Sequence, residues 1–528
     1  MWLLCLIISL VGLTIFSIYI FKLKGQRGNK NKIVLILTGF VWIGFGVLFM
    51  WMTRPWWHWL WFGVFYMNPT FWIFTTVIIL GMRLLYWLRI KRRFILTGMG
   101  LWIILTVSLL VLGPAITKVK IYHSIIPITQ RISLLPETIK VRYLPLEIAL
   151  QYGENKIQES EIKLGDIDPI VFDDKFSWVA ARVPNGFWRG LSYKSDGFAL
   201  IGSDGSVKML RQQMEYGEGM YITDNILWKL RERKYWIEIP EIYYLLNGEE
   251  IVGIAPYLSY KFEFPVRIPR WGGVFIFHSD GRIEDFTPEQ ARQLPYIQEQ
   301  RIFPESLTRL YVESWAYQNG IWNAWFTHRD QIQIPRIKYS TNQMPFLIPT
   351  AEGSMWMVAT EPWGKAYGIF KIFWVDTNTG NIQLYELPRE TALIGPNRIW
   401  DYIKTAYPTY DWYILTSKGS TGNILAIEPR PVIKQSKLYW MASLTNLQYG
   451  GVSATFLVDA QNPTNILSFK TEKDLEDFIA GTEYIGSEGI TTPAEPISSE
   501  IRDRFQKIKE LQREIEREIE GLEKLITK

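Results

Sequence analysis

Four apolar stretches near the beginning of the chain, and the basic residues between them, constrain the fold more than any other feature. The stretches cover residues 2–21, 33–52, 69–88 and 94–113. Each has about 20 residues, enough for a helix to cross a hydrocarbon core about 30 Å thick. The first connector carries five basic residues and the third reads Arg-Ile-Lys-Arg-Arg, whereas the second carries only Arg54. Because basic residues in short loops stay on the cytoplasmic side, the first and third connectors are predicted to lie inside.

This charge asymmetry predicts a four-helix transmembrane domain over residues 1–117, with both chain ends outside. The protein is then a multi-pass protein of the cell (plasma) membrane whose large C-terminal part is extracytoplasmic. A signal peptide is the rival interpretation of the first stretch, but its basic residues follow the apolar run instead of preceding it. Tryptophans before Asn68-Pro69 indicate either a belt at the membrane interface or the beginning of a longer, bent third span. They are Trp56, Trp57, Trp59 and Trp61.

The charge and the cysteine content exclude some classes of protein. The net charge is +5, and much of the excess lies in the two connectors predicted to be inside. No basic stripe that would bind nucleic acid is therefore expected on the outer part. The chain has 1 cysteine, Cys5, in the first apolar stretch, so no intrachain disulfide is possible. The outer part must depend on its hydrophobic core for stability.

A strand, an acidic turn and a second strand occur four times in the outer part. The turns contain Asp204-Gly205, Asp280-Gly281, Asp376 with Gly380, and Asp459. Asp-Gly and Asn-Thr-Gly between alternating apolar residues indicate hairpins, because Gly adopts the positive φ that tight turns need. Upstream of each hairpin the sequence predicts another strand, and before that strand a helix in which apolar residues recur at three and four. These helices are predicted at residues 144–153, 224–233, 304–315 and 396–407.

Each unit is predicted to be a helix that covers one face of an antiparallel meander, an α+β arrangement. The predicted modules are residues 118–215, 216–300, 301–390 and 391–481. The sequence Val375-Asp-Thr-Asn-Thr-Gly-Asn-Ile382, with the strand before it, resembles the PepSY module. That resemblance implies a module outside the membrane that binds or restrains a partner, with no catalytic residues to carry over. The fourth copy departs from the pattern, since Asn462-Pro463 lies in its turn and no Gly does.

The last part of the chain is predicted to be a linker, residues 482–497, followed by an amphipathic helix, residues 498–528. Apolar residues recur every seven positions in this helix, and others occupy the companion position. They are Ile501, Ile508, Ile515 and Leu522, with Leu511 and Leu525. Two interpretations stay open. One is a weak coiled coil through which copies self-associate, and the other is a helix that docks on the protein's own sheet or stays solvated.

Candidate catalytic and binding residues are few. The four histidines have no metal-binding spacing, and neither a metal nor a cofactor is predicted. Asp376 and Asp459 are interpreted as turn residues rather than as paired catalytic carboxylates, because Asp side chains accept hydrogen bonds from nearby backbone amides. Trp363 and Tyr367 lie in a segment rich in Gly and Pro and form a candidate partner-binding loop. Packing within the loop is the alternative.

The predicted fold class is an α-helical membrane domain, an α+β extracytoplasmic domain of repeated PepSY-like modules, and a long C-terminal helix. The predicted function is that of a membrane-anchored, non-enzymatic binding or scaffold protein that presents its modules to a protein partner. Two alternatives stay open. One is a structural subunit of a membrane complex, and the other is a membrane-bound hydrolase or glycan-processing enzyme that uses carboxylates on the sheet rims.

Overall fold

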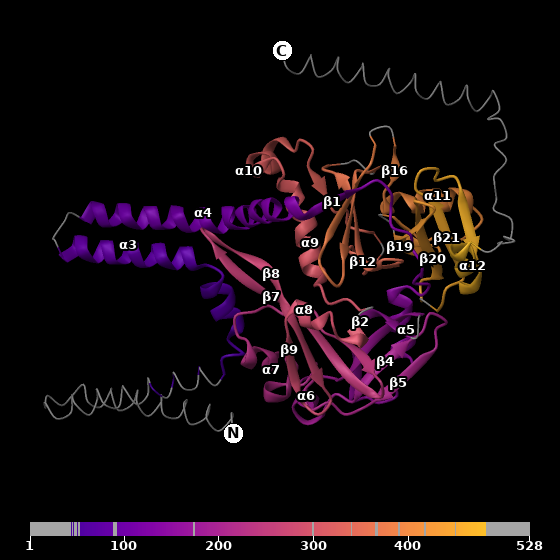
Figure 1. Cartoon of the computed structure of the whole chain (residues 1–528), viewed down its shortest axis with the longest axis horizontal. Helices are drawn as coiled ribbons and strands as arrows, with labels where there is room; N and C mark the ends of the chain where they lie inside the picture. Colours follow the sequence, from indigo (N-terminus) through magenta and orange to yellow (C-terminus); the bar gives the residue numbers. More distant parts are fainter. Residues whose placement is uncertain are drawn as a thin grey trace, which may run out of the picture.

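A long helical hairpin projects from a body made mostly of β-strands (Figure 1). The computed structural model describes residues 44, 46, 50, 53–87 and 92–481, except 173–174, 298–299, 339, 365–367, 389–390, 417–418 and 449. The hairpin consists of α3 (Pro69–Trp87) and α4 (Arg92–Ile125). A short helix of the π type, η1 (Trp59–Tyr66), precedes α3 and is bent by 69° from it.

The predicted fold class is wrong in its membrane part. Among the described residues, one helical segment, Gly100–Ile128, is by itself long and apolar enough to cross a membrane. The η1–α3 pair passes the same test only as a broken span. The first two predicted spans lie outside the described residues, apart from Gly44, Gly46 and Met50. The β-rich body also forms several separate antiparallel sheets, with helices that are short.

Local chemistry explains why the apolar runs did not predict the helix boundaries. The Asn68 side chain donates to the carbonyls of Gly63 (2.8 Å) and Val64 (3.3 Å) at the end of η1, and Pro69 is suited to begin a new helix. The helix also does not end with the fourth apolar stretch at Gly113, because α4 continues through Pro114 to Ile125. Proline removes one helical donor here without ending the helix.

The helical hairpin is continuous with one sheet of the body. After α4, the short η2 (Ile126–Ile128) leads into β1 (Thr129–Ile132). β1 pairs in parallel with β15 (Ile382–Glu386), from Thr129 opposite Ile382 to Ile132 opposite Tyr385. The end of α4 is therefore held by backbone hydrogen bonds to a strand about 250 residues away along the chain.

The body contains four antiparallel meanders in chain order. The first is β2 (Ile162–Phe172), β3 (Lys175–Pro184), β4 (Gly197–Ile201) and β5 (Val207–Arg211). The second is β6 (Tyr243–Asn247), β7 (Glu250–Glu263), β8 (Val266–His278) and β9 (Ile283–Phe286). The third is β11 (Phe346–Thr350), β12 (Gly353–Pro362), β14 (Lys371–Asp376) and β15, extended by β1 and by β10 (Ile332–Gln333). The fourth is β19 (Ile424–Lys434), β20 (Lys437–Asn446), β21 (Ala454–Asp459) and β22 (Ile466–Phe469).

Helices and short strands lie between and beside these meanders. The four predicted helices are confirmed as α5 (Leu146–Glu154), α7 (Ile226–Arg233), α9 (Glu305–Ser314) and α11 (Ile399–Ala406), the last preceded by η7 (Pro396–Arg398). The other helices are α6 (Phe187–Ser192), α8 (Pro288–Ala291), α10 (Gly320–Trp322), α12 (Glu472–Ala480), η3 (Ile222–Asp224), η4 (Pro295–Ile297), η5 (Trp315–Tyr317) and η6 (Asn323–Thr327). Two small sheets pair β13 (Gly368–Ile369) with β16 (Leu393–Ile394) and β17 (Ile414–Thr416) with β18 (Gly419–Thr421).

The predicted turn chemistry is confirmed in all four hairpins. Asp204 and Asp280 each accept a backbone N–H from the residue two positions later, at 2.9 Å. Oδ1 of Asp376 accepts the N–H groups of Asn378 (2.7 Å) and Thr379 (2.9 Å). Oδ1 of Asp459 accepts those of Gln461 (2.8 Å) and Asn462 (3.1 Å). These aspartates therefore shape turns, which is the role that Asp most often has at such positions.

One hydrogen bond recurs in three of the four units. The indole Nε1–H groups of Trp178, Trp356 and Trp440 donate to carbonyls that lie two residues before a helix. The acceptors are Leu144 (3.0 Å), Phe303 (3.2 Å) and Ile394 (2.8 Å). In the second meander the corresponding position is Gly253 on β7, which pairs with Phe277 on β8. A Cβ at this position would overlap the ring of Phe277. This recurrence favours a repeated unit, while the module boundaries and the resemblance to PepSY stay predictions.

Buried arginines tie the units to one another. Arg301 donates to Asp168 from the first meander and to Glu241 (3.0 Å), which precedes the second. The other oxygen of Glu241 accepts the N–H of Glu305 at the beginning of α9, at 3.0 Å. Arg142 is placed in the same way: it donates to Glu428, whose second oxygen accepts the first N–H of α5 at 3.0 Å. Each of these two glutamates therefore pairs with a buried arginine and also accepts the first N–H of a helix.

Candidate functional site

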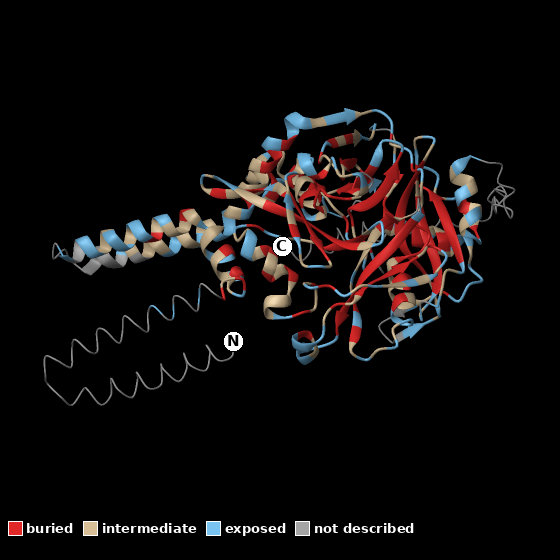
Figure 2. Cartoon of the chain, turned by 60° about the horizontal axis from the view of Figure 1, so that its bottom comes forward, coloured by how far each residue is buried: buried red, intermediate tan, exposed pale blue. Residues whose placement is uncertain are grey.

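The α3–α4 hairpin exposes large apolar side chains along both helices, whereas the strands of the body bury theirs (Figure 2). Within the segment Gly100–Ile128, only 6% of the most apolar stretch of 18 residues is buried. The large apolar side chains that are more than half exposed are Ile73, Val77, Ile79, Leu80, Leu84 and Trp87 on α3, and Leu101, Ile103, Ile104, Val107, Leu110 and Val111 on α4. A core helix of a water-soluble domain would bury such a surface. An exposed apolar surface of this extent is typical of a region that contacts lipid or another protein.

The break between η1 and α3 is fastened to the second meander. Tyr66 donates to the carbonyl of Tyr260 at 3.3 Å. The guanidinium of Arg267 donates from Nε to the carbonyl of Tyr66 at 2.6 Å, and its centre lies 3.7 Å from the centre of the Tyr66 ring. Thr70, in the first turn of α3, donates to the carbonyl of Pro265. The tip of the β7–β8 hairpin therefore fixes the position at which the chain enters α3.

His58 holds the other end of η1. Its Nε2 lies 3.0 Å from the carbonyl oxygen of Tyr235 and 3.1 Å from that of Ile237, a geometry that suits an Nε2–H donor shared between two acceptors. The imidazole is buried and stacks on Phe62, with ring centres 4.7 Å apart. Burial, and secondarily the charge of Arg231, lowers the pKa of His58 from 6.5 to about 4. A neutral imidazole therefore fastens η1 to the segment after α7.

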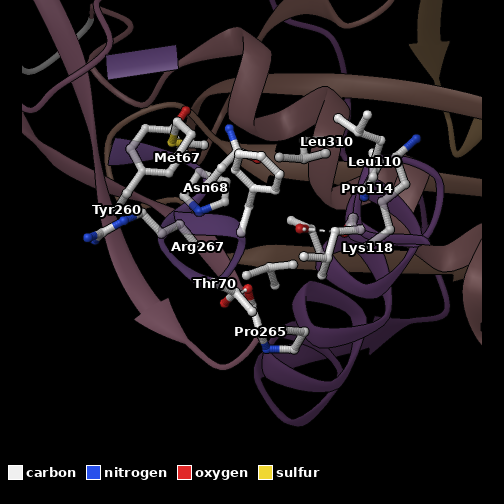
Figure 3. Close-up of a pocket in the computed structure, with 16 residues that line it drawn as sticks. Met67, Asn68, Thr70, Leu110, Pro114, Lys118, Tyr260, Pro265, Arg267 and Leu310 are labelled. Carbon is white, nitrogen blue, oxygen red and sulfur yellow. Dashed lines mark hydrogen bonds between the residues drawn. The ribbon is translucent and has the colours of Figure 1, made fainter. Parts of the chain in front are cut away.

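A cavity of about 410 Å³ lies where the helical hairpin meets the body. Residues from the η1–α3 break, from α4 between Leu109 and Lys118, from the β7–β8 tip, and Leu310 of α9 line it. Figure 3 shows Met67, Asn68, Tyr260 and Arg267 on one side of this space and Leu110, Pro114, Lys118 and Leu310 on the other. Its volume is within the range of about 300–1,000 Å³ that is usual for small-molecule sites. We call it the junction pocket.

The junction pocket is apolar along α4 and cationic at its rim. Among the described residues that line it, Lys118 and Arg267 are basic and none is acidic. The Lys118 ammonium pairs with Glu313 at 2.9 Å, but Glu313 also accepts from Arg309 at 3.1 Å, so this group of charges keeps an excess positive charge. In the described part of the chain no carboxylate pairs with Arg267. Such a site favours an anion that carries an apolar portion.

Exposed aromatic side chains come from the elements around the base of the helical hairpin. Trp59 of η1 is 65% exposed, Phe264 at the β7–β8 tip 65%, and Trp322 of α10 71%. Phe262 and Phe326 are exposed as well. Figure 1 shows the β7–β8 tip and α10 on the side of the body from which α3 and α4 leave. Aromatic rings in such a position are typical of a membrane interface. Of these aromatic residues, the sequence indicated only Trp59, as one of the tryptophans before Asn68.

The residues predicted as sites are mostly separate from the junction pocket. Trp363 is 50% exposed and stacks on His328, with ring centres 5.0 Å apart. Tyr367, its predicted companion, lies outside the described residues, as do the linker and the whole C-terminal helix with its heptad residues. The partner-binding loop and the self-association helix therefore stay predictions.

Two acidic groups of the described structure, Asp376 and Glu305, are engaged with other partners. A smaller cavity, of about 180 Å³, is lined by Glu352 and Asp376, but Oδ1 of Asp376 already accepts two turn amides. Burial raises the pKa of Glu305 to about 8, yet this carboxyl lies within the network around Arg301. No group of three His, Cys, Asp or Glu side chains in the described ranges is placed to hold a metal ion.

Sequence reasoning missed Arg267 and Lys118, because the pocket that they rim is assembled from distant segments. Two weak signals were present in the sequence: the aromatic cluster with Asn68-Pro69, and the tip Phe262-Glu-Phe264-Pro265, with two large rings in a polar turn. Comparisons with protein-family models, with curated proteins and with solved structures gave no match.

Proposed function

We propose that this protein is a membrane-anchored binding or scaffold protein, with α3 and α4 crossing the bilayer and the β-body outside the cytoplasm. The observation that carries this proposal is the exposed apolar surface of the helical hairpin. The 19 residues of α3 extend about 28 Å at 1.5 Å per residue, close to the hydrocarbon thickness of about 30 Å. Aromatic residues around the base of the hairpin then lie at the level of the lipid headgroups.

The charges support one orientation of the anchor. The end of α3 and the beginning of α4 lie at the far end of the hairpin from the body (Figure 1). In the sequence, the run Arg89-Ile-Lys-Arg-Arg93 joins these two ends. Basic residues in a short connector stay on the cytoplasmic side, so this end faces the cytoplasm. The body is then on the opposite side, as the charge asymmetry predicts.

The body supports binding rather than chemistry. Its units are joined by buried ion pairs and by a shared core, which gives a rigid surface for a partner. Asp376 and Asp459, which might have served as paired carboxylates, are engaged in turns. The resemblance to PepSY implies the same kind of role, which is to bind or restrain a protein outside the membrane. A subunit of a membrane complex is the alternative that uses the same hairpin surface.

Membrane insertion is tested by flotation with liposomes and by extraction at alkaline pH. We expect the full chain to float and to resist extraction. The double variant Ile104→Lys/Val107→Lys, on the exposed face of α4, is expected to lose both properties, because each buried Lys costs about 2.5–3.5 kcal/mol at the centre of a span. Leu134→Lys, at an exposed position of the body, is the matched control and should behave like the wild type.

Two outcomes would contradict the proposal. One is a wild-type chain that stays in solution without detergent and does not float. The other is protection of the body from protease in intact cells, which would reverse the orientation. Native gels separate the alternatives: a stable large assembly favours the complex subunit, and a small species that captures a protein by crosslinking favours the binding protein.

A further inference from the structure

We infer that the junction pocket binds an anionic, phosphate-bearing lipid, with its headgroup at Arg267 and Lys118 and its acyl chains along α4. This inference rests on the proposed function, because it requires α3 and α4 to lie in a bilayer. It identifies a ligand class for a site between the anchor and the body.

The depth of the junction pocket matches the headgroup region. The pocket is lined by Asn68, which precedes α3, by Thr70 in the first turn of α3, and by Gly113, Pro114 and Thr117 of α4. Toward the far end of the hairpin, α4 exposes Leu110 and Val107, and in the direction of the body it buries Ala115 and Ile121. The change from lipid-facing to protein-facing side chains therefore occurs at the level of the pocket. A ligand there has an apolar surface on one side and a polar one on the other.

The charges at the rim are arranged for an anion. The Arg267 guanidinium is held from one edge by its Nε bond to the Tyr66 carbonyl, and one face lies on the Tyr66 ring. This leaves the terminal nitrogens to donate in a fork, the geometry in which Arg binds phosphate. Lys118 adds a second cation whose carboxylate partner, Glu313, is shared with Arg309. The amino end of α3, at Pro69, adds the positive end of a helix dipole.

The apolar walls specify the other half of the ligand. Leu109 and Leu110 of α4, with Phe71 of α3 and Leu310 of α9, line the same cavity as the two cations. Leu110 is 67% exposed, so the wall continues without interruption onto the lipid-facing surface of the hairpin. A free phosphate would leave these side chains uncovered. Acyl chains cover them and remain in contact with the bilayer, which is why a lipid fits this site better than a soluble anion.

Native mass spectrometry of the detergent-purified full chain tests this inference. The protein is supplied with equal amounts of phosphatidylglycerol and phosphatidylcholine that carry identical acyl chains. We expect the wild type to retain phosphatidylglycerol in preference to phosphatidylcholine. Arg267→Gln and Lys118→Gln should each reduce that preference about fivefold, the effect of one cation near an anionic headgroup. Arg267→Lys should retain most of it. Arg270→Gln, on the same strand but outside the pocket, is the matched control.

Three outcomes would overturn the inference. The first is equal retention of the two lipids by the wild type. The second is an equal lipid preference in the Arg267→Gln and Arg270→Gln proteins. The third is displacement of phosphatidylglycerol by inorganic phosphate at the same concentration, which would show that the site binds a free anion.

Flotation of the same proteins separates the two proposals. Wild-type protein that floats without a lipid preference contradicts the lipid site alone, and protein that fails to float contradicts the membrane anchor.

Discussion

The two halves of α4 are both apolar but lie in different surroundings. Between Leu101 and Val111 most of the large side chains are exposed, and Ile104 is 64% exposed. Past Pro114 the helix buries Ile121 completely and packs Tyr122 against Trp315, with ring centres 5.3 Å apart. In the proposed topology, hydropathy alone does not separate the span from the core part of the same helix. Lys118 and Lys120 mark the change, because charged side chains are tolerated where a helix leaves the lipid.

The largest expected effect is on the body alone. Arg301→Ala leaves Asp168 and Glu241 without their cation in the interior, and breaking a buried ion pair in this way typically costs about 3–5 kcal/mol. We expect the free energy of unfolding of the body, measured by denaturant titration in detergent, to fall by that amount. Flotation should not change, since the hairpin makes no contact with this pair. A parallel loss of flotation would show that the two regions are not independent.

A pair of substitutions in α4 tests the comparison between its halves directly. Ile121→Ala removes a fully buried side chain and should lower the free energy of unfolding of the body by about 2–5 kcal/mol. Ile104→Ala, the same change in the exposed half, should alter it by no more than about 0.5 kcal/mol. Equal losses in the two proteins would mean that the outer half is also packed against protein.

The seam between the two regions should respond to acid through His58. Its pKa is about 4 in the folded protein and 6.5 ordinarily, so below pH 6.5 the unfolded chain binds a proton that the folded chain does not. The stability that the neutral imidazole contributes is complete above pH 6.5 and is lost as the pH falls to about 4. His58→Gln keeps an N–H donor without titrating. We expect a shallower loss of stability in that variant over this interval, and identical slopes would contradict the role of His58.

The smallest expected effect is at Thr117, where the exposed half of α4 meets its buried half. Thr117 donates from its hydroxyl to the carbonyl of Gly113 at 3.0 Å. This bond lies next to Pro114, which has no backbone N–H to donate. Thr117→Val keeps the shape and removes this bond, which should cost about 0.5–1.5 kcal/mol in thermal or denaturant unfolding. Ser124→Ala, which removes a comparable hydroxyl bond to the carbonyl of Ile121 in the buried half, provides the comparison. No change in either protein would show that these hydroxyls do not stabilise α4.

Features encoded by neighbouring residues could be predicted from the sequence. The four Asp turns and the four helices follow from hydrogen bonds and apolar spacings over a few positions, and the structure contains them. The end of α4 could not be predicted, because a Pro in an apolar run is compatible with both a helix end and a continuing helix. The junction pocket was out of reach for another reason. Arg267 and the Tyr66 carbonyl it binds are 201 residues apart, and no local pattern brings them together.

The direct passage from α4 into β1 has a mechanical consequence. Three residues of η2 separate the helix from a strand that is bonded along its length to β15. So short a connection couples the direction of α4 to that of the third meander. In the proposed topology, a tilt of α3 and α4 in the bilayer would therefore turn the third meander with them, and a force on the body would reach the membrane through the backbone hydrogen bonds between β1 and β15.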